Sequence, residues 1–384
     1  MPLTSKLPDV GTTIFTVMSK LAADHGAINL SQGYPDFDGP PELLERVTYY
    51  LNHGYNQYAP MPGLPQLREQ IATKVATLYD CEVDAESEVT ITSGATVALF
   101  CAITALVHEG DEVIVFDPVY DSYQPAVDLC GGITRHVPLL RPTFTPDWDR
   151  VANLLSDKTR MIIINTPHNP SGGVWTGADI EALRSVLGDR DIYLLADEVY
   201  EHIIFDGVPH QSLLRYPDLF QRSLVVSSFG KTYHTTGWKM GYCVAPQDLM
   251  TEFRKVHQYV NFVSNTPIQH GLADYMASHP QHVLGLPDFY QRKRDLFCAL
   301  LDGSRFGIRP SGGTYFQLLD YSAISNEADV DLARRLTMEA GVASIPISVF
   351  YSSPEEQRDL KALRFCFAKD DATLAKAAEI LCKL

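Results

Sequence analysis

The sequence predicts an α/β fold built around a mainly parallel sheet. From residue 88 onward, short apolar strands alternate with helical segments, and polar residues follow each strand directly. Such alternation is typical of parallel sheets, because a helix is needed to carry the chain back to the start of the next strand. The chain has 384 residues, 45% of them hydrophobic, which is enough for a large core and for more than one domain.

The part of the chain before residue 88 is predicted to be helical, with turn-rich loops between the helices. Apolar spacing or a starting proline predicts helices over 12–25, 40–51 and 65–79. In the loop 29–37, a glycine such as Gly33 lets backbone approach a ligand closely, although this loop taken alone favours a plain turn glycine. In the loop 56–63, Tyr58 offers a hydroxyl to an anion or simply packs.

Six apolar runs predict the strands of the sheet. They cover 88–92, 112–116, 161–164, 192–196, 224–226 and 242–245. The small-residue turn 93–96 opens a helix over 97–107, and free N–H groups at such a helix start attract phosphate. Open α/β sheets bind ligands at the carboxyl ends of their strands, so the polar residues after each strand are candidate site residues.

The remainder of the chain has an α+β pattern. It is predicted to contain helices between 247 and 303, one of them over 287–301, a strand at 314–319, a helix at 329–340, a strand at 363–368 and a closing helix. Arg364 is a lone guanidinium within the last strand. Its planar fork suits a bidentate carboxylate, which is either a protein Asp or Glu or a substrate.

Composition narrows the classes of partner and compartment. The net charge of −16, without Lys/Arg blocks, argues against nucleic acid or an anionic membrane as a partner. No apolar run is long enough to span a bilayer, and residues 1–10 lack the apolar core of a signal peptide. The seven cysteines are scattered without a C-x-x-C pair, which predicts reduced thiols in a cytoplasmic protein and no metal site.

Lys231 is the residue around which the candidate chemistry is organised. It follows the buried run 224–226, and burial at the mouth of a strand disfavours the charged form of a lysine. Lysines held in this way are nucleophilic and form Schiff bases with carbonyls, including that of pyridoxal phosphate (PLP). A surface lysine after a strand is the alternative.

Other residues complete the set that PLP chemistry requires. Asp197 directly follows four apolar residues, which is costly unless a cation is paired with it, either a protonated pyridine nitrogen or a structural partner. Asn169 and Tyr200 suit the ring hydroxyl, Tyr120 suits the ring face, Ala95, Thr96, Ser228 and Lys239 suit the phosphate, and Arg364 suits a substrate carboxylate. The missing G-x-G-x-x-G and Walker lysine disfavour nicotinamide or ATP.

The ordered motifs resemble those of the class I aminotransferases of PLP fold type I. They are SQGYPDF (31–37), NQYAPMPG (56–63), TSGAT (92–96), NTPHNPSG (165–172), DEVYEH (197–202), SSFGKTYHTTGWKMGY (227–242), SIPISVFYS (344–352) and RFCFAKD (364–370). The resemblance covers nearly the whole chain. Within the family it is to the kynurenine/glutamine aminotransferase branch, and to that branch's bacterial methionine aminotransferases.

The resemblance implies a large PLP-binding domain over 46–285, with a seven-stranded type of sheet. It also implies a small α+β domain made from 286–384 together with the segment 1–45.

Roles follow for single residues. Lys231 is implied to form the internal aldimine and to shuttle the proton, Asp197 to keep the pyridine nitrogen protonated, and Tyr120 to stack on the ring. Asn169 and Tyr200 are implied to bind the ring oxygen, and Ala95, Thr96, Ser228 and Lys239 to hold the phosphate. Arg364 is implied to clamp the substrate carboxylate with Asn169 and the Gly33 backbone, and Tyr58 to reach the phosphate of a neighbouring subunit in a homodimer.

Two positions depart from the common family pattern. Many relatives carry arginine where this chain has Lys239, and tryptophan or phenylalanine where it has Tyr120. A lysine is a point charge rather than a fork, so the grip on the phosphate is expected to differ.

The expected reaction is transfer of an amino group from an L-amino acid to a 2-oxo acid. Ile14, Phe15, Tyr34, Phe262 and Phe350 are candidates for an apolar side-chain pocket, although each is equally explained by core packing. Such a pocket favours methionine, aromatic residues or glutamine over aspartate. Kynurenine-type transamination, β-elimination on cysteine conjugates by the same lysine, and a PLP-binding regulator are the alternatives.

Overall fold

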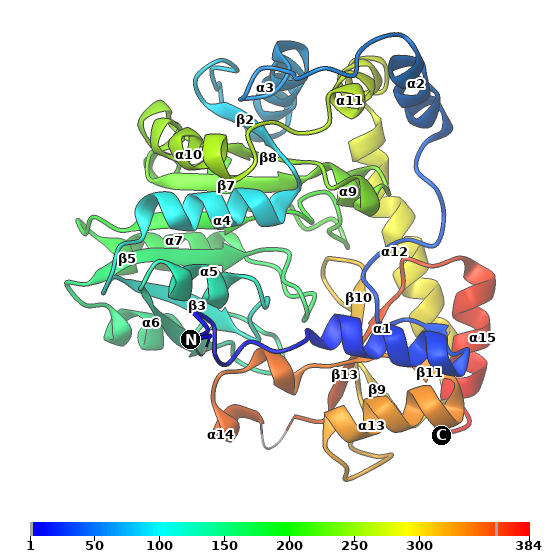
Figure 1. The fold of residues 1–384 in the computed structure, drawn as a ribbon. Coiled ribbons are helices and arrows are strands. Elements are labelled where there is room, and N and C mark those ends of the chain that lie inside the picture. The colour runs from blue at the N-terminus through cyan, green and yellow to red at the C-terminus, as the bar shows by residue number, and fades with distance from the viewer. Residues whose placement is uncertain (1–2, 358–359) are drawn as a thin grey trace.

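The computed structural model describes residues 3–357 and 360–384, and a seven-stranded sheet forms its centre (Figure 1). In spatial order the strands are β2 (Val89–Thr92), β8 (Gly241–Val244), β7 (Ser223–Ser228), β6 (Tyr193–Asp197), β5 (Thr159–Asn165), β3 (Glu112–Asp117) and β4 (Ile133–Pro138). β8 runs antiparallel to both of its neighbours, and all other pairs are parallel. The mainly parallel α/β fold predicted from the sequence is therefore confirmed.

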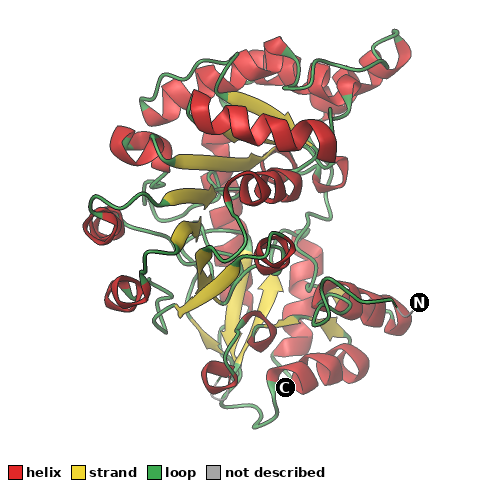
Figure 2. Ribbon diagram, turned by 60° about the vertical axis from the view of Figure 1, so that its left-hand side comes forward, coloured by secondary structure: helices red, strands yellow, loops and turns green. Residues whose placement is uncertain are grey.

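Helices cover both faces of this sheet (Figure 2). Alternate residues of a strand point to opposite faces, and in β5 Met161 and Ile163 enter one core cluster while Ile162 and Ile164 enter another. The first cluster lies under α4 (Ala95–Leu106), α5 (Tyr123–Leu129) and α10 (Gln247–Val260). The second lies under α2 (Pro41–Asn52), α3 (Pro65–Tyr79), α6 (Trp148–Leu154), α7 (Gly177–Leu187), the short α8 (Pro217–Phe220) and α11 (Thr266–Ser278).

Burial on both faces explains why most strands could be predicted as apolar runs. β4 was not predicted, because its residues 133–136 are exposed or half-buried and read Ile-Thr-Arg-His. It is an edge strand, and within the described part of the chain its one partner strand is β3. Its place in the sheet therefore comes from pairing rather than from its own composition.

The long helix α12 (His282–Leu300) corrects a second prediction. A start at Pro287 was expected, but Pro287 lies inside the helix. The lost backbone hydrogen bond is offset by packing, since Val283 and Leu286 are buried, and by the contact of His282 Nε2 with the Thr232 carbonyl at 2.9 Å. Similarly, the helix predicted over 329–340 is α13 (Asp329–Arg335) followed by the π-helical turn Leu336–Ala340.

A smaller sheet lies beside the carboxyl-terminal edge of the large one. Its strand β13 (Ala362–Cys366) pairs antiparallel with β10 (Phe316–Asp320) and β12 (Ile345–Pro346), and β9 (Gly307–Ile308) pairs with β10. The N-terminal segment joins this part of the chain, because β1 (Ile28–Asn29) pairs in parallel with β11 (Val342–Ala343). The helices α1 (Ile14–His25), α12, α13 and α15 (Asp371–Leu381) pack around one further core cluster, and α14 (Pro354–Gln357) is a single turn (Figure 1). The domain boundaries after residues 45 and 285 stay a prediction.

Two features of this fold position the site. The parallel strands β3, β5, β6 and β7 end at the same edge, with polar residues at Asp117, Asn165, Asp197 and Ser228. The smaller sheet reaches that edge through Arg364 of β13, which donates to the Asn169 side chain after β5. Among the described residues, no helix combines the length and apolarity needed to cross a membrane.

Candidate active site

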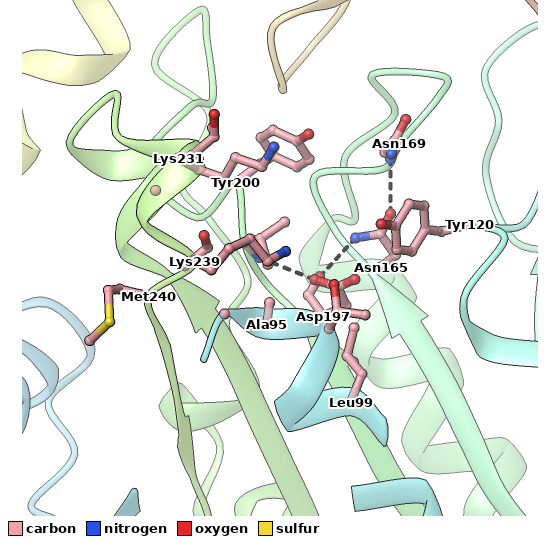
Figure 3. Close-up of a pocket in the computed structure, with 16 residues that line it drawn as sticks. Ala95, Leu99, Tyr120, Asn165, Asn169, Asp197, Tyr200, Lys231, Lys239 and Met240 are labelled. Atoms are coloured by element: carbon pink, nitrogen blue, oxygen red, sulfur yellow. Dashed lines mark hydrogen bonds between the residues drawn. The ribbon is translucent and has the colours of Figure 1, made fainter. Parts of the chain in front are cut away.

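A cavity of about 170 Å³ lies at the carboxyl ends of the central strands (Figure 3). It is lined by residues that the sequence analysis selected from distant segments: Ala95, Thr96, Tyr120, Asn169, Asp197, Tyr200, Ser228, Lys231 and Lys239. The structure thus brings nearly the whole predicted cofactor set to one place. Tyr58 is the exception.

Lys231 lies in the single-turn helix α9 (Phe229–Thr232), which begins directly after β7. Its Nζ donates to the Tyr315 hydroxyl at 2.8 Å and to the Gly33 carbonyl at 3.3 Å. Burial lowers the pKa of Lys231 to about 8, and this outweighs the nearby carboxylate of Asp197, which acts in the opposite direction. A lysine with such a pKa has an accessible neutral form near pH 7 and is therefore a competent nucleophile and base.

Asp197 ends β6 and is buried. Its carboxylate accepts from the Tyr123 hydroxyl at 2.6 Å and from the Val199 N–H at 3.4 Å. Burial raises the pKa of Asp197 to about 6, against these hydrogen bonds and the charge of Lys231. A buried carboxylate beside a cavity suits a cationic group in that cavity.

Asn165 and Asn169 shape the wall next to Asp197. The Asn165 side chain donates to the Asp197 carbonyl at 2.9 Å and accepts from the Asn169 N–H at 2.9 Å (Figure 3). These bonds tie the loop after β5 to the end of β6. They hold the Asn169 side chain at the cavity, where it was predicted to be.

The other end of the cavity is suited to an anion. α4 begins after Gly94, which has φ +84° and gives the helix start no side-chain cap, so its first N–H groups remain available to a ligand. A Cβ atom on Gly94 would lie 3.5 Å from Lys239 Nζ, which places the ammonium group directly beside this turn. Ser228 lines the same cavity.

Arg364 on β13 brings a buried cation from the smaller sheet. It is 1% exposed, and its Nη1 and Nη2 donate at 2.8 Å to the Asn169 side-chain oxygen and to the Ser31 carbonyl. Its Nε has no hydrogen-bond partner among the described residues. The rings of Phe316 and Phe15 lie 3.9 and 5.1 Å from the guanidinium carbon. A buried guanidinium with an unused donor is suited to a carboxylate ligand.

Comparison with known proteins agrees with this arrangement. The family model described as aminotransferase class I and II matches residues 25–381. The chain belongs to this family.

Individual relatives agree with the family assignment. The chain is 55% identical to methionine aminotransferase of Escherichia coli over 380 residues, covering 99% of this chain and 98% of that protein. It is 32% identical to a kynurenine–oxoglutarate transaminase of Dictyostelium discoideum, covering 97% and 94%. The solved structure of YbdL from Escherichia coli, whose description identifies a methionine aminotransferase function, superposes with a TM-score of 0.97 at 54% identity and covers 100% of both chains. The protein is therefore an enzyme that transfers amino groups between amino acids and 2-oxo acids, with the fold type I architecture.

Class I aminotransferases use PLP, and the residues of this enzyme fit that cofactor. The cavity offers a lysine amine of lowered pKa, a buried carboxylate for a protonated ring nitrogen, and an anion site formed by the α4 start and Lys239. Tyr120 lines the same cavity, and its hydroxyl stays protonated because burial raises its pKa to about 12. The donor set matches the aldehyde, pyridine and phosphate groups of PLP.

Only some of the residues predicted to bind the substrate lie at the two cavities. Phe15 and Phe350 face each other with ring centroids 5.6 Å apart. Phe350 and Ile14 line a larger neighbouring cavity of about 840 Å³ that shares Tyr120 with the first. Tyr34 and Phe262 line neither of these cavities. The Gly33 carbonyl bonds to Lys231 and Tyr315. Their roles in substrate binding stay predictions.

Tyr58 lies apart from the cavity of its own chain. Its side chain is 82% exposed, and its ring contacts Phe262 edge to face at 5.4 Å. An exposed pair of aromatic rings is compatible with a role toward a second subunit, which stays a prediction.

Three residues of the site were not found from the sequence. Asn165 ends a strand four residues before Asn169, and Tyr123 follows Tyr120 by three residues, so proximity to a candidate carried a weak signal for both. Tyr315 had no such signal, because it reaches Lys231 from a segment 84 residues away.

Proposed function

We propose that the enzyme binds PLP in the cavity between Lys231, Asp197 and the start of α4, with Lys231 as the point of covalent attachment. The main support is that a lysine amine of lowered pKa, a buried carboxylate and an anion site line one cavity. Bound PLP supplies an electron sink that acidifies the α-hydrogen of an amino acid.

The protein's own residues then perform binding and proton transfer. Asp197 is the partner of the ring nitrogen, Asn169 and Tyr200 are partners of the ring oxygen, and Tyr120 covers the ring face. Arg364 binds the substrate α-carboxylate through its fork and orients the α-hydrogen toward Lys231 Nζ. With PLP held by these residues, the Lys231 amine would take up that hydrogen as a proton and release it again, acting as the proton shuttle.

We propose methionine and other long apolar or aromatic amino acids as the preferred donors. Phe15 and Phe316 cover Arg364, and Phe350 packs on Phe15, so the surface next to the carboxylate site is apolar. The named relatives, a methionine aminotransferase and a kynurenine transaminase, act on donors of this kind. An aspartate side chain would lose its hydration against these rings.

We further propose a homodimer with shared sites, in the cytoplasm. The exposed rings of Tyr58, Tyr259 and Phe262 support an interface in this region, and the seven free cysteines support a reducing compartment.

The test is spectroscopic and uses the purified full chain. We expect a visible cofactor band that is lost on adding L-methionine and returns on adding a 2-oxo acid, and a borohydride-stable adduct on the Lys231 peptide. Specificity constants for methionine, phenylalanine, glutamine and aspartate should place aspartate last. Release of pyruvate from a cysteine conjugate without any acceptor would instead favour a lyase, and aspartate as the best donor would contradict the pocket assignment.

A further inference from the structure

Tyr315 makes the shortest hydrogen bond that the structure gives to the Lys231 amine. Its hydroxyl lies 2.8 Å from Lys231 Nζ, and its side chain is fully buried. We propose that Tyr315 is a positioning residue for Lys231, which holds the free amine with its lone pair turned toward the substrate. This inference rests on the proposed role of Lys231 as the attachment point and base.

The direction of the hydrogen bonds supports this role. A phenol has one donor, and Tyr315 uses it on the Gly33 carbonyl at 2.6 Å, so its oxygen is an acceptor toward Lys231. The Gly33 carbonyl accepts from Lys231 as well, at 3.3 Å. A neutral amine has two N–H bonds and one lone pair. With both N–H bonds directed to Tyr315 and Gly33, the lone pair points elsewhere.

The remaining direction faces the cavity. Lys231 lines the cavity at the strand ends, whereas neither Tyr315 nor Gly33 does. The two acceptors therefore lie on the wall behind the amine. A lone pair turned away from them is directed to the space where we place the cofactor and the substrate.

Both acceptors are held rigidly. The Tyr315 ring packs edge to face on Tyr200 at 5.1 Å and on Phe316 at 5.0 Å. At Gly33 a Cβ atom would lie 2.7 Å from the Phe316 ring, so only glycine lets this backbone approach so closely. Burial raises the pKa of Tyr315 well above its ordinary value, so the hydroxyl keeps the proton that it donates to Gly33.

The same loop also connects to the carboxylate site. Arg364 donates to the Ser31 carbonyl, two residues before Gly33. One backbone segment therefore touches both the group that binds the substrate and, through Gly33 and Tyr315, the group that removes its proton. A free lysine side chain has four flexible torsions, and fixing its end near the α-hydrogen lowers the entropic cost of proton transfer.

The test compares Tyr315→Phe with Tyr290→Phe. Tyr290 is also fully buried, its ring contacts Tyr315 at 5.8 Å, and its hydroxyl contacts His234 at 2.9 Å rather than Lys231. Each variant thus removes one buried hydroxyl from the same core cluster. Circular dichroism and the thermal midpoint serve as the check on folding.

The first readout does not depend on catalysis. The cofactor-free full chain is labelled with 1-fluoro-2,4-dinitrobenzene over a range of pH, and labelling is read at the Lys231 peptide by mass spectrometry. An acceptor stabilises the ammonium form, so its loss should lower the labelling midpoint of Lys231 by about 0.5 to 1 pH unit in Y315F and leave it unchanged in Y290F. The other groups that surround Lys231 are Asp197, Tyr200, Lys239, Arg364 and Cys366, and of these only Tyr200 loses a side-chain hydrogen bond, to Tyr315, in Y315F.

The second readout is steady-state kinetics with methionine. We expect kcat to fall about tenfold or more in Y315F, with KM changed less than about threefold, and both near wild type in Y290F. Para-aminophenylalanine at position 315 keeps the ring and a donor for Gly33 but is a poor acceptor. It should shift the labelling midpoint as Y315F does, which keeps the test valid if Y315F folds poorly.

The outcomes separate this inference from the proposed function. Wild-type labelling and kcat in Y315F, or equal losses in Y315F and Y290F, would overturn the role of Tyr315 alone. A wild-type chain that forms no borohydride-stable cofactor adduct on Lys231 would overturn the proposed function itself.

Discussion

Arg364 Nη1 donates to the Asn169 side-chain oxygen at 2.8 Å and so joins two sheets that share no strand. Arg364 belongs to β13 of the smaller sheet, and Asn169 to the loop after β5 of the larger one. Because Asn169 is also proposed to contact the cofactor, this bond sets the distance between the carboxylate site and the cofactor site.

We expect Arg364→Lys to impair substrate binding specifically. Lysine keeps the charge but lacks the fork, so kcat/KM for methionine should fall about 100-fold, corresponding to about 2.7 kcal/mol, and mainly through KM. The cofactor absorption band should remain. Arg222→Lys, at the opposite end of the sheet next to β7, is the control and should leave the kinetics unchanged. A comparable loss in both variants would argue against a carboxylate clamp.

We expect Lys231→Ala to abolish transamination without unfolding the chain. The loss should be at least about four orders of magnitude in kcat, since Lys239 at the anion site is the only other lysine among the described residues that lines the cavity. Mass spectrometry after borohydride treatment should find no cofactor adduct, and circular dichroism should match the wild type. The exposed Lys255→Ala serves as control. Wild-type turnover by K231A would remove the basis of the mechanism.

Asp197→Asn should stabilise the cofactor-free chain at high pH and at the same time lower kcat. An aspartate pKa near 4 in the unfolded chain rises to about 6 in the folded one, so the folded chain holds the proton more tightly. The stability that this group contributes is complete below pH 4 and is lost as pH rises through 6.

We therefore compare the free energy of unfolding of the cofactor-free D197N chain with that of the wild type. The difference should shift in favour of D197N by up to about 3 kcal/mol between pH 4 and pH 8, because asparagine stays neutral throughout. Its kcat should fall at least about 100-fold, since the ring nitrogen loses its anionic partner. Denaturant unfolding at the two pH values and steady-state kinetics are the measurements, with the exposed Asp331→Asn as control. A stability difference that is equal at both pH values would contradict the assignment.

Tyr58→Phe tests the shared site. Because the side chain is 82% exposed in one chain, its substitution should leave the thermal midpoint of a monomer unchanged but weaken cofactor binding about tenfold in a dimer. Co-expressed Y58F and K231A chains should form hybrid dimers in which one of the two sites has both intact residues. After tandem-tag purification, we expect such hybrids to show about half of the wild-type activity with wild-type cofactor affinity. Hybrids that need about tenfold more cofactor to reach this activity would place Tyr58 in its own chain's site.

Much of the fold was predictable from local patterns. The strands β2, β3, β5, β6, β7 and β8 are apolar because helices cover both faces of the sheet, and α3 has the predicted bounds Pro65–Tyr79. β4 was missed because an edge strand carries half-exposed polar residues, and the start of α12 was misplaced because buried contacts outweigh the effect of Pro287.

In the candidate site, too, some features could be predicted from the sequence and others could not. Lys231, Asp197 and the turn before α4 lie at or just after strand ends, so their chemistry and position could be inferred together. The contacts of Tyr315 and of the Gly33 carbonyl with Lys231 could not be inferred, because they join segments 84 and 198 residues away in the chain.

By itself the sequence determined the alternation of strands and helices and the residue types at the strand ends, because burial and turn chemistry act over a few neighbouring residues. Only the tertiary structure decided which of these groups meet and how they are held. Packing of the smaller sheet against the strand ends places Arg364 beside Asn169 and Tyr315 behind Lys231. The lowered pKa of Lys231 and the raised pKa of Asp197 also arise there, because the loss of water at this junction comes from both parts of the chain together.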